Sequence, residues 1–295
     1  MKSGYVAVIG RANAGKSTLI NVLVGEKVAI VSPRPQTTRD RILGVLTDKE
    51  YQIAFIDTPG LYRADNLLNS VMQKTAEDSV ADVDLIMFVI DAHQGLSEND
   101  KALVSRFIKT KVPFIIVLSK TDIMPESLLI SEIKELSSFG VEIVPVSARK
   151  GRNIKELLRV IVSRLPKADK IFEQDIISDR SERFMVSEII REKILLKFER
   201  EIPHGVAVIV NKFKLRDDKK VYDIDVDIIC EKPNHKAILI GKGGKAIKEV
   251  SSFARNDLEK FLDKKVFLTT DIKVKEDWRN SAFLIKEHGY SQGNE

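Results

Sequence analysis

The 295-residue sequence contains little cysteine, no long apolar run and no large excess of either charge. Cys230 is the only cysteine, which excludes an internal disulfide framework and a cysteine-rich zinc site. The longest apolar runs, such as residues 85–90, are far shorter than the roughly 18 residues of a membrane span. A strand-like run begins at Tyr5, which leaves no room for a signal peptide. We therefore expect a cytoplasmic globular protein.

Charge is unevenly distributed along the chain. The formal net charge is +5, but residues 232–275 alone carry 11 basic and 5 acidic side chains. The four histidines are scattered and show no metal-ligand spacing. The local basic excess suggests an anionic partner for that part of the chain.

The first half alternates short β-branched runs with helical patterns, which predicts an α/β doubly wound, mostly parallel sheet. Residues 41–47 and 51–57, joined by "TDKE", are expected to form a hairpin of edge strands. We predict a P-loop domain at 1–168 and a polar linker at 169–180. The expected strands are 5–9, 41–47, 51–57, 84–90, 113–118 and 141–146.

The second half, 181–295, has a different pattern. Ser181 can cap a helix, and strands at 206–213 and 221–229 should follow it. The second strand alternates apolar residues with aspartates, which predicts an acidic outer face that a polyanion should avoid. A short helix, a helix at 245–262 and a strand at 265–275 complete a small α+β domain.

The stretch "GRANAGKST" matches the phosphate-loop pattern GxxxxGK[ST] between an expected strand and an expected helix. Its backbone amides should surround phosphates, Lys16 should neutralise them, and the Ser17 hydroxyl should bind Mg²⁺. The expected contacts are Gly10, Arg11, Ala12, Asn13, Ala14, Gly15, Lys16, Ser17 and Thr18.

Three further loops follow strands at the same expected edge of the sheet. "DTPG" offers Asp57 to Mg²⁺ through water and the Gly60 amide to a γ-phosphate. In "SKTD", Asp122 can accept two N–H groups from guanine, a donor pair that adenine lacks. "SAR" can support the guanine oxygen with its backbone amides. Together they predict a GTP site that also includes Ser119, Lys120, Ser147, Ala148 and Arg149.

The segment "VSPRPQTTRD" (31–40) is polar and suits a switch loop that responds to the γ-phosphate. Either Thr37 or Thr38 could reach Mg²⁺, and Thr38 is preferred. The residues assigned to switching are Gln36, Thr37, Thr38, Arg39, Asp40, Thr58, Pro59 and Leu61.

A second glycine–lysine loop, "IGKGGK", fails the phosphate-loop pattern because no hydroxyl follows Lys245. It resembles instead the IGxxG signature of KH domains, here of type II, in which the backbone of single-stranded RNA approaches the glycines. The expected RNA contacts are Ile240, Gly241, Lys242, Gly243, Gly244, Lys245 and Lys248.

Two features near the C-terminus leave alternatives open. Lys273 and Lys275 could contact phosphates or lie on a solvated edge strand. Trp278, the only tryptophan, could stack on a base or anchor a terminal helix, and the anchor is preferred.

These motifs together resemble the Era family, bacterial ribosome-assembly GTPases in the group that also contains TrmE and EngA. The resemblance covers nearly the whole chain, including "QTTRD", "SDRSERFMVSEIIREKIL", "EIPHGVAV" and "KVKEDWR". It implies a GTP/GDP- and Mg²⁺-dependent switch that binds the 3′ end of 16S ribosomal RNA and assists assembly of the 30S subunit. It also implies a monomer, with at most peripheral contact with the inner face of the membrane.

The same resemblance bears on catalysis. Leu61 replaces a glutamine that orients water in many GTPases, so intrinsic hydrolysis should be slow. Asn13 and Lys16 are the expected catalytic residues, and Asn13 either links to a bound K⁺ or simply favours the loop conformation. Ser119 departs from the usual asparagine and could weaken nucleotide binding. The alternative function is an RNA-binding protein that holds guanine nucleotide as a structural ligand with little hydrolysis.

Overall fold

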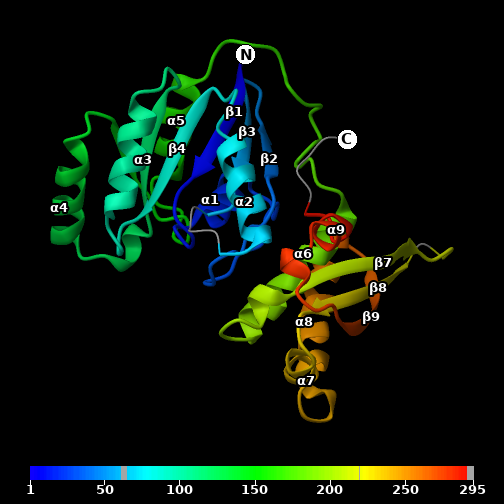
Figure 1. Ribbon diagram of the computed structural model, residues 1–295. Helices are drawn as coiled ribbons and strands as arrows, with labels where there is room; N and C mark the ends of the chain where they lie inside the picture. The colour runs from blue at the N-terminus through cyan, green and yellow to red at the C-terminus, as the bar shows by residue number, and fades with distance from the viewer. Residues whose placement is uncertain (61–64, 219, 291–295) are drawn as a thin grey trace. The chain divides into compact units, whose positions relative to one another are not determined.

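The computed structural model describes residues 1–60, 65–218 and 220–290, which form two compact units. Among these residues the first unit comprises 1–31, 38–60 and 72–179, and the second comprises 32–37, 65–71 and 180–290. Leu61, which we assigned to the switch, lies outside the described residues. No helix in the described ranges is long and apolar enough to cross a membrane. Figure 1 labels most of the elements of both units.

The first unit is built on a six-stranded sheet in the order β2-β3-β1-β4-β5-β6. All neighbouring strands are parallel except β2 and β3, which form the predicted antiparallel hairpin. Our placement of both hairpin strands at the edge was wrong for β3, because β3 also pairs with β1. The strands are β1 (Lys2–Ile9), β2 (Ile42–Thr47), β3 (Tyr51–Asp57), β4 (Leu85–Asp91), β5 (Phe114–Ser119) and β6 (Glu142–Pro145).

Helices cover both faces of this sheet, as the doubly wound pattern predicts. Helices α1 (Lys16–Val24) and α5 (Ile154–Arg164) contribute to one apolar core. Helices α3 (Glu98–Ile108) and α4 (Glu126–Ser137) contribute to a second core on the other face. Helix α2 spans Leu67–Asp78. Because β4 is buried along its whole length, the edge formed by its carboxyl end and those of its neighbours is held rigidly.

Residues 169–179, which we predicted to be part of a linker, run along β2 and β3 within the first unit. Gln52 Oε1 accepts hydrogen bonds from the amides of Ile171 and Phe172 at 2.7 and 2.9 Å. The Val45 amide donates to the Ile177 carbonyl at 2.7 Å. Thus this segment satisfies part of the outer edge of β2.

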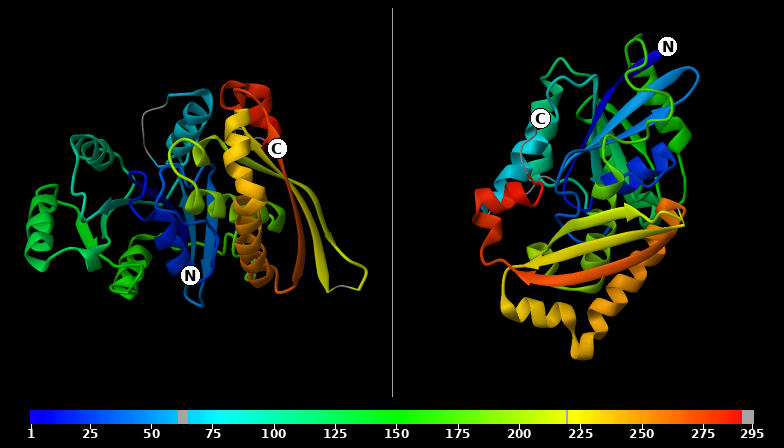
Figure 2. Two further views of the ribbon diagram at one scale, coloured as in Figure 1. Left: turned by 90° about the horizontal axis from the view of Figure 1, so that it is seen from below. Right: turned by 90° about the vertical axis from the view of Figure 1, so that its right-hand side faces the viewer.

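The second unit has the predicted element order of helix, two strands, two helices and strand. Its sheet has the order β7-β8-β9 (Figure 2). Its apolar core includes side chains from helices α6 and α8. Ser181 caps α6 as expected, because its hydroxyl accepts from the Phe184 amide at 3.2 Å. The elements are α6 (Glu182–Lys197), β7 (Ala207–Leu215), β8 (Val221–Cys230), α7 (Pro233–Ile240), α8 (Lys245–Leu262), β9 (Lys265–Val274) and α9 (Ala282–Glu287).

The acidic row of β8 is partly neutralised by neighbouring cations, which the alternation alone did not predict. Asp223 pairs with Arg216 at 2.7 Å and with Lys212 at 3.3 Å. Asp227 pairs with Lys273 at 2.6 Å, so the charge of Lys273 is matched by that carboxylate. The expectation of a bare acidic face needs this correction, because the paired cations offset the negative charge of two of the aspartates.

Trp278 is fully buried, which excludes base stacking and confirms the anchoring role. Its indole N–H donates to the Gly205 carbonyl at 2.9 Å. The rings of His288 and Tyr290 pack against it, with centroids 5.1 and 6.0 Å away. The indole therefore ties the segment that ends at residue 290 to the core of the second unit.

Candidate functional site

The phosphate-loop residues connect β1 to α1 at the carboxyl edge of the first sheet. Gly10 has φ +149°, and a Cβ there would lie 2.3 Å from the Val89 carbonyl oxygen. Gly15, with φ +97°, is the N-cap of α1, and Asn13 also has a positive φ of 63°. This backbone brings the loop amides and the start of α1 together, an arrangement that favours phosphate.

Lys16 is buried and points back into its own loop. Its ammonium donates to the carbonyls of Gly10 and Arg11 at 3.1 and 3.0 Å. Burial lowers the pKa of Lys16 to about 8, and the Asp57 charge opposes this shift. The buried cation is therefore weakly stabilised and is suited to neutralising an incoming phosphate.

Three side-chain oxygens meet beside this lysine. Ser17 Oγ donates to Asp57 Oδ2 at 2.6 Å, and Thr38 Oγ1 lies 2.9 Å from Ser17 Oγ and 3.1 Å from Asp57 Oδ2. The other oxygen, Asp57 Oδ1, is buried and has no hydrogen-bond partner among the described residues. Burial also raises the pKa of the Asp57 carboxyl, against the effect of Lys16. Hard oxygen donors around an unsatisfied carboxylate oxygen fit Mg²⁺ and its bound water.

The two candidate threonines of the switch segment point in different directions. Thr37 Oγ1 donates to the Arg34 carbonyl at 2.7 Å and lies 2.8 Å from Ser32 Oγ. Its hydroxyl is thus used within the loop, whereas that of Thr38 lies at the oxygen cluster. The geometry favours Thr38 as the metal ligand.

The expected guanine-binding residues are connected to the phosphate loop by short contacts. Ser119 Oγ donates to the Ala14 carbonyl at 2.5 Å, so the serine forms a bridge to the loop despite its short side chain. Lys120, with φ 57°, donates to the Asn13 carbonyl at 2.7 Å and to Asp91 at 2.8 Å. These bonds place the two loops in one rigid assembly.

Asp122 is oriented by the "SAR" loop. Ser147 donates to Asp122 Oδ1 at 2.6 Å, and this hydrogen bond, the main cause, lowers the pKa of the carboxyl. The Ser147 backbone exchanges hydrogen bonds with Arg152, which fixes the turn through Ala148 and Arg149. An ionised Asp122 at this edge can accept the paired N–H donors of guanine.

The "DTPG" loop approaches the phosphate loop closely. A Cβ at Gly60 would lie 2.7 Å from Ala12 Cα, so only glycine fits without displacement. Thr58 Oγ1 donates to the Val8 carbonyl at 2.9 Å and holds the start of the loop. Gly60 therefore lies directly beside the phosphate loop, from where its amide can donate to the terminal phosphate of a bound nucleotide.

The second glycine–lysine loop has a different surrounding. Gly241, Gly243 and Gly244 all have positive φ, and a Cβ at Gly243 or Gly244 would meet no described atom within 4 Å. The loop lysines at 242 and 245 and the nearby lysine at 248 line an accessible surface, and Ile240 packs partly buried against the core. Open glycines between lysines leave room for a sugar–phosphate backbone.

Two family models match the chain. A model described as "50S ribosome-binding GTPase" matches residues 5–120, and a KH domain model matches residues 201–279. GTPase Era of Clostridium novyi (strain NT) is 44% identical over 293 residues, which cover 99% of both chains. GTPase Era of Alkaliphilus metalliredigens (strain QYMF) is 42% identical over 291 residues, 98% of this chain and 99% of that protein.

The chain belongs to the Era family.

Two solved Era structures have the same fold. A complex of Era with MgGDPNP and nucleotides 1506–1542 of 16S ribosomal RNA superposes with a TM-score of 0.95, at 39% identity. A single-residue variant of Aquifex aeolicus Era, bound to GDP·AlF4⁻, gives the same TM-score and identity. Each alignment covers 99% of this chain and 100% of the other. The predicted fold, a P-loop GTPase domain followed by a KH domain, is confirmed.

Membership of the Era family also decides between the two functions considered. GTPase activity belongs to this family, so a purely structural role for guanine nucleotide is not favoured. Both of these Era structures hold a guanine nucleotide, and the GDPNP complex also holds Mg²⁺.

Sequence reasoning predicted Arg11 as a loop residue but missed Asp91 and Asp100, which position the Era-family nucleotide loops. Arg11 donates to the Gly95 carbonyl at 2.6 Å and pairs with the buried Asp100 at 3.0 Å. Asp91 forms an ion pair with Lys120 at 2.8 Å. Asp91 could have been found, because it ends a buried strand at the carboxyl edge. Asp100 could not have been found, because the sequence "SEND" indicates only a helix-capping box. Asp100 does form that capping box with Ser97, in addition to its pair with Arg11.

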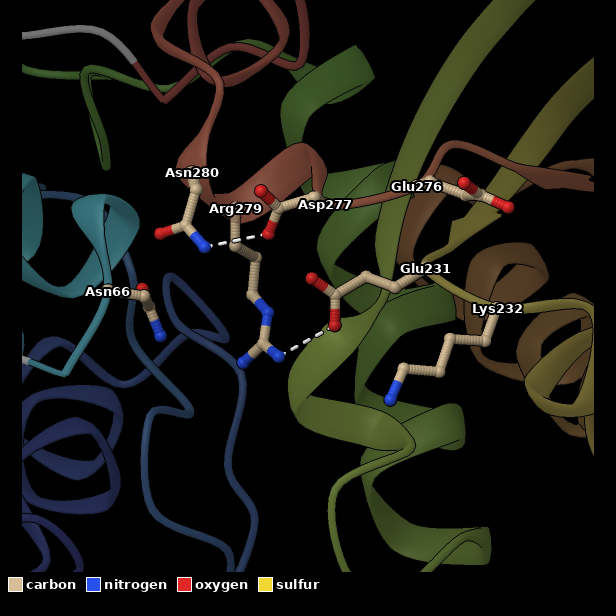
Figure 3. A pocket seen from close by; sticks show the side chains of 7 residues that line it. All are labelled: Asn66, Glu231, Lys232, Glu276, Asp277, Arg279 and Asn280. Atoms are coloured by element: carbon tan, nitrogen blue, oxygen red, sulfur yellow. Dashed lines mark hydrogen bonds and ion pairs between the residues drawn. The ribbon is translucent and has the colours of Figure 1, made fainter.

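A mixed-charge cavity of about 360 Å³ in the second unit was not foreseen either. Figure 3 shows its side chains, with Arg279 paired to Glu231 and Asn280 bonded to Asp277. Asn280 also accepts the Leu67 amide at 3.2 Å, which anchors the first turn of α2. Because acidic groups match its cations, this cavity lacks the character of a phosphate site. It is lined by Asn66, Glu231, Lys232, Glu276, Asp277, Arg279 and Asn280.

Proposed function

We propose that this Era-family GTPase binds and hydrolyses GTP and binds single-stranded 16S ribosomal RNA near its 3′ end, and thereby assists 30S subunit assembly. The observation that carries the proposal is the near-complete superposition on Era in complex with MgGDPNP and nucleotides 1506–1542 of that RNA. The lysines and open glycines at 241–245 support the RNA-binding half of the proposal.

In the proposed nucleotide site, the amides of 10–18 surround the phosphates. Lys16 exchanges its two loop carbonyls for phosphate oxygens and remains protonated there. Ser17 and Thr38 would hold Mg²⁺ directly and Asp57 would hold it through water, because their oxygens cluster and Asp57 Oδ1 has no other partner among the described residues. The bound metal supplies positive charge to the phosphates. Asp122 accepts the guanine N–H pair, which excludes adenine.

We propose that hydrolysis is slow without a partner and is stimulated by potassium. Leu61 offers no polar group to orient water. Asn13 stands in the phosphate loop with the left-handed backbone that suits its side chain. Phosphate release measured in matched K⁺ and Na⁺ buffers tests the idea, and equal rates would remove the ion from the mechanism.

We also propose that the γ-phosphate orders segment 31–40 and residues 57–60 and 65–68, and that it changes RNA access to the KH domain. Residues 61–64 of the predicted 57–68 segment lie outside the described residues. Such coupling must be reciprocal, so RNA must tighten GTP binding by the same factor that GTP tightens RNA binding.

The test of the whole function is a binding assay with a 16S 3′-end RNA and the intact protein. We expect tight, salt-sensitive binding that differs between GDP and a non-hydrolysable GTP analogue. Equal RNA affinity with both nucleotides would remove the coupling, and no RNA binding at all would remove the assignment.

We place the protein in the cytoplasm as a monomer, with any association with the inner face of the membrane being peripheral. The single, buried Cys230 thiol fits a reducing compartment. Sedimentation of the purified protein and flotation with anionic vesicles test the two statements separately.

A further inference from the structure

Helix α6 carries a buried ion pair that the core of the second unit does not explain. Arg191 is fully buried and Glu188 is 6% exposed. The Arg191 guanidinium donates two hydrogen bonds to the Glu188 carboxylate, from Nε to Oε1 at 2.7 Å and from Nη2 to Oε2 at 2.5 Å. Burying such a pair is costly, and apolar side chains of similar volume commonly stabilise a core equally well. The pair therefore calls for a role beyond packing.

The remaining donors of Arg191 point at the switch segment. Nη2 donates to the Thr37 carbonyl, and Nη1 donates to the Gln36 carbonyl at 3.5 Å. Gln36 has φ 59°, a left-handed conformation that is uncommon for a non-glycine residue. Glu188 thus orients the Arg191 guanidinium, which in turn holds the backbone carbonyls of Gln36 and Thr37.

Other contacts of the segment support the same fixed conformation. The Thr37 hydroxyl closes the loop onto the Arg34 carbonyl at 2.7 Å. Arg34 in turn pairs with Glu199 at 3.6 Å. Residues 32–37 are therefore anchored in the second unit by side chains at two points, of which Arg191 is the buried one.

Thr38 is the next residue in the chain. Its hydroxyl lies 2.9 Å from Ser17 Oγ and 3.1 Å from Asp57 Oδ2, in the oxygen cluster assigned to Mg²⁺. We propose that Arg191 is a positioning residue for Thr38: by holding the Gln36 and Thr37 carbonyls, it sets the position of the metal-binding hydroxyl. The inference rests on the proposed nucleotide function and assigns part of that site's control to a KH-domain helix.

The consequence is selective for the triphosphate state. Switch segments of this kind are ordered through the γ-phosphate and its metal, and they contribute little when GDP is bound. Loss of Arg191 should therefore weaken a GTP analogue and spare GDP. A residue with only a structural role would weaken both nucleotides equally or neither.

Helix α6 is also connected to the RNA-binding loop. Lys197 pairs with Glu249 of α8 at 2.6 Å, one residue after Lys248. A change at the Arg191 contact would thus be transmitted through α6 to the helix that begins at the second glycine–lysine loop. This gives the reciprocal coupling a named residue.

The experiment compares the wild type with the double variant Arg191→Met/Glu188→Leu. The double change avoids leaving a lone buried carboxylate, which would itself destabilise the helix. Dissociation constants for a non-hydrolysable GTP analogue and for GDP are measured with Mg²⁺. We expect analogue affinity to fall about tenfold, the usual effect of losing hydrogen bonds from a charged group, with GDP affinity within about twofold.

The matched control is Arg183→Met on the same helix, since Arg183 donates to the Val210 and Asn211 carbonyls of β7. It should leave the analogue-to-GDP ratio unchanged. Should the double variant fail to melt cooperatively, Arg191→Lys replaces it, because an ammonium keeps the charge but cannot fork to both carbonyls. We expect an intermediate loss of about threefold for the lysine variant.

An unchanged ratio in the double and lysine variants, or an equal loss for both nucleotides, would overturn the positioning role. Wild-type protein that fails to bind either nucleotide would instead overturn the proposed function. In the supporting case, the RNA affinity of the double variant should also become nearly independent of which nucleotide is bound.

Discussion

The two glycine–lysine loops of this protein are similar in sequence but differ in how deeply their side chains are buried. In the first, Lys16 is 6% exposed and bonded to its own loop, and Gly10 is pressed against the Val89 carbonyl. In the second, the lysines are accessible, and Gly243 has open space around it within the part of the chain that the structure describes. The first loop is thus closed and buried, which suits a compact anion, whereas the second is exposed, which suits an extended nucleic-acid backbone.

The comparison shows that glycine serves two purposes. In the first loop it removes a clash with backbone that cannot move, so substitution should damage the fold locally. In the second loop Gly241 avoids a clash with Ala246, whereas Gly243 keeps a surface clear for a ligand. Replacing Gly243 by a residue that tolerates its φ of +60° should therefore spare the fold and damage binding. Each of the following changes tests that division.

The largest effect is expected from Gly10→Ala. The new Cβ would lie 2.3 Å from the Val89 carbonyl oxygen, at a φ of +149° that side chains rarely adopt. We expect a loss of about 2–4 kcal/mol in stability and no measurable nucleotide binding. Thermal unfolding and nucleotide titration measure both. Gly25→Ala, with φ +85° and no described neighbour within 4 Å, should cost only about 1 kcal/mol and retain binding. Similar behaviour of the two variants would contradict the argument.

Gly243→Asp should come next, with RNA affinity lowered about 100-fold and nucleotide affinity unchanged. The side chain fits sterically, but it places a negative charge and added bulk where phosphates should lie. Gly243→Asn is the matched variant, because both residues tolerate the left-handed backbone and only their charge differs. We expect about a tenfold loss for asparagine. Filter binding at fixed salt compares them, and full RNA affinity in the aspartate variant would refute the assignment of the loop.

Ser119→Ala should have a moderate effect confined to the first loop. It removes the 2.5 Å bond to the Ala14 carbonyl, a buried contact. Nucleotide affinity should fall about tenfold, while the preference for guanine persists through Asp122. Ser119→Asn, which restores the more usual residue, should bind at least as tightly as the wild type. If the alanine variant binds GTP normally, the bridge is dispensable.

The smallest expected effect is a pH dependence that the buried lysine produces. Unbound Lys16 has a pKa of about 8, below its ordinary value of 10.5, and phosphates require its charged form. Binding should therefore take up a proton, and affinity should fall about threefold between roughly pH 7.5 and 8.5. Lys16→Arg stays charged and should lose this part of the slope. Calorimetry in buffers of different ionisation enthalpy measures the proton uptake directly, and no uptake near pH 8 would contradict the assignment.

Much of this architecture could be predicted from the sequence because local patterns carry it. Period-two alternation defined β8, the capping serine at 181 fixed the start of α6, and the phosphate-loop spacing located the first site. The edge position of β3 was wrong, because strand order depends on crossovers that no local pattern records. The partners of Asp223 and Asp227 likewise come from outside the strand that carries them.

The motif loops of the candidate site could be predicted from the sequence. The side chains from other elements that hold these loops in place could not. Loops that end parallel strands must meet at one edge, so convergence of the four motifs followed from the strand pattern. Asp100 supports the phosphate loop through Arg11, and Arg191 holds the switch segment through the Thr37 carbonyl, each from a helix far away in the sequence. Their roles depend on tertiary packing, and a charged residue in a helix gives no sign that it will be buried.

The strip formed by residues 169–179 changes how the first domain should be isolated. Val45 donates its amide to the Ile177 carbonyl at 2.7 Å, and Leu43 donates its own to Asp179 at 3.0 Å. A protein truncated at residue 168 would lose these hydrogen-bond partners. Its edge strand β2 would then be exposed and could pair with a strand of another molecule. The segment that joins the domains thus also protects β2 from pairing with another molecule. A GTPase fragment that is to remain monomeric should retain residues 169–179.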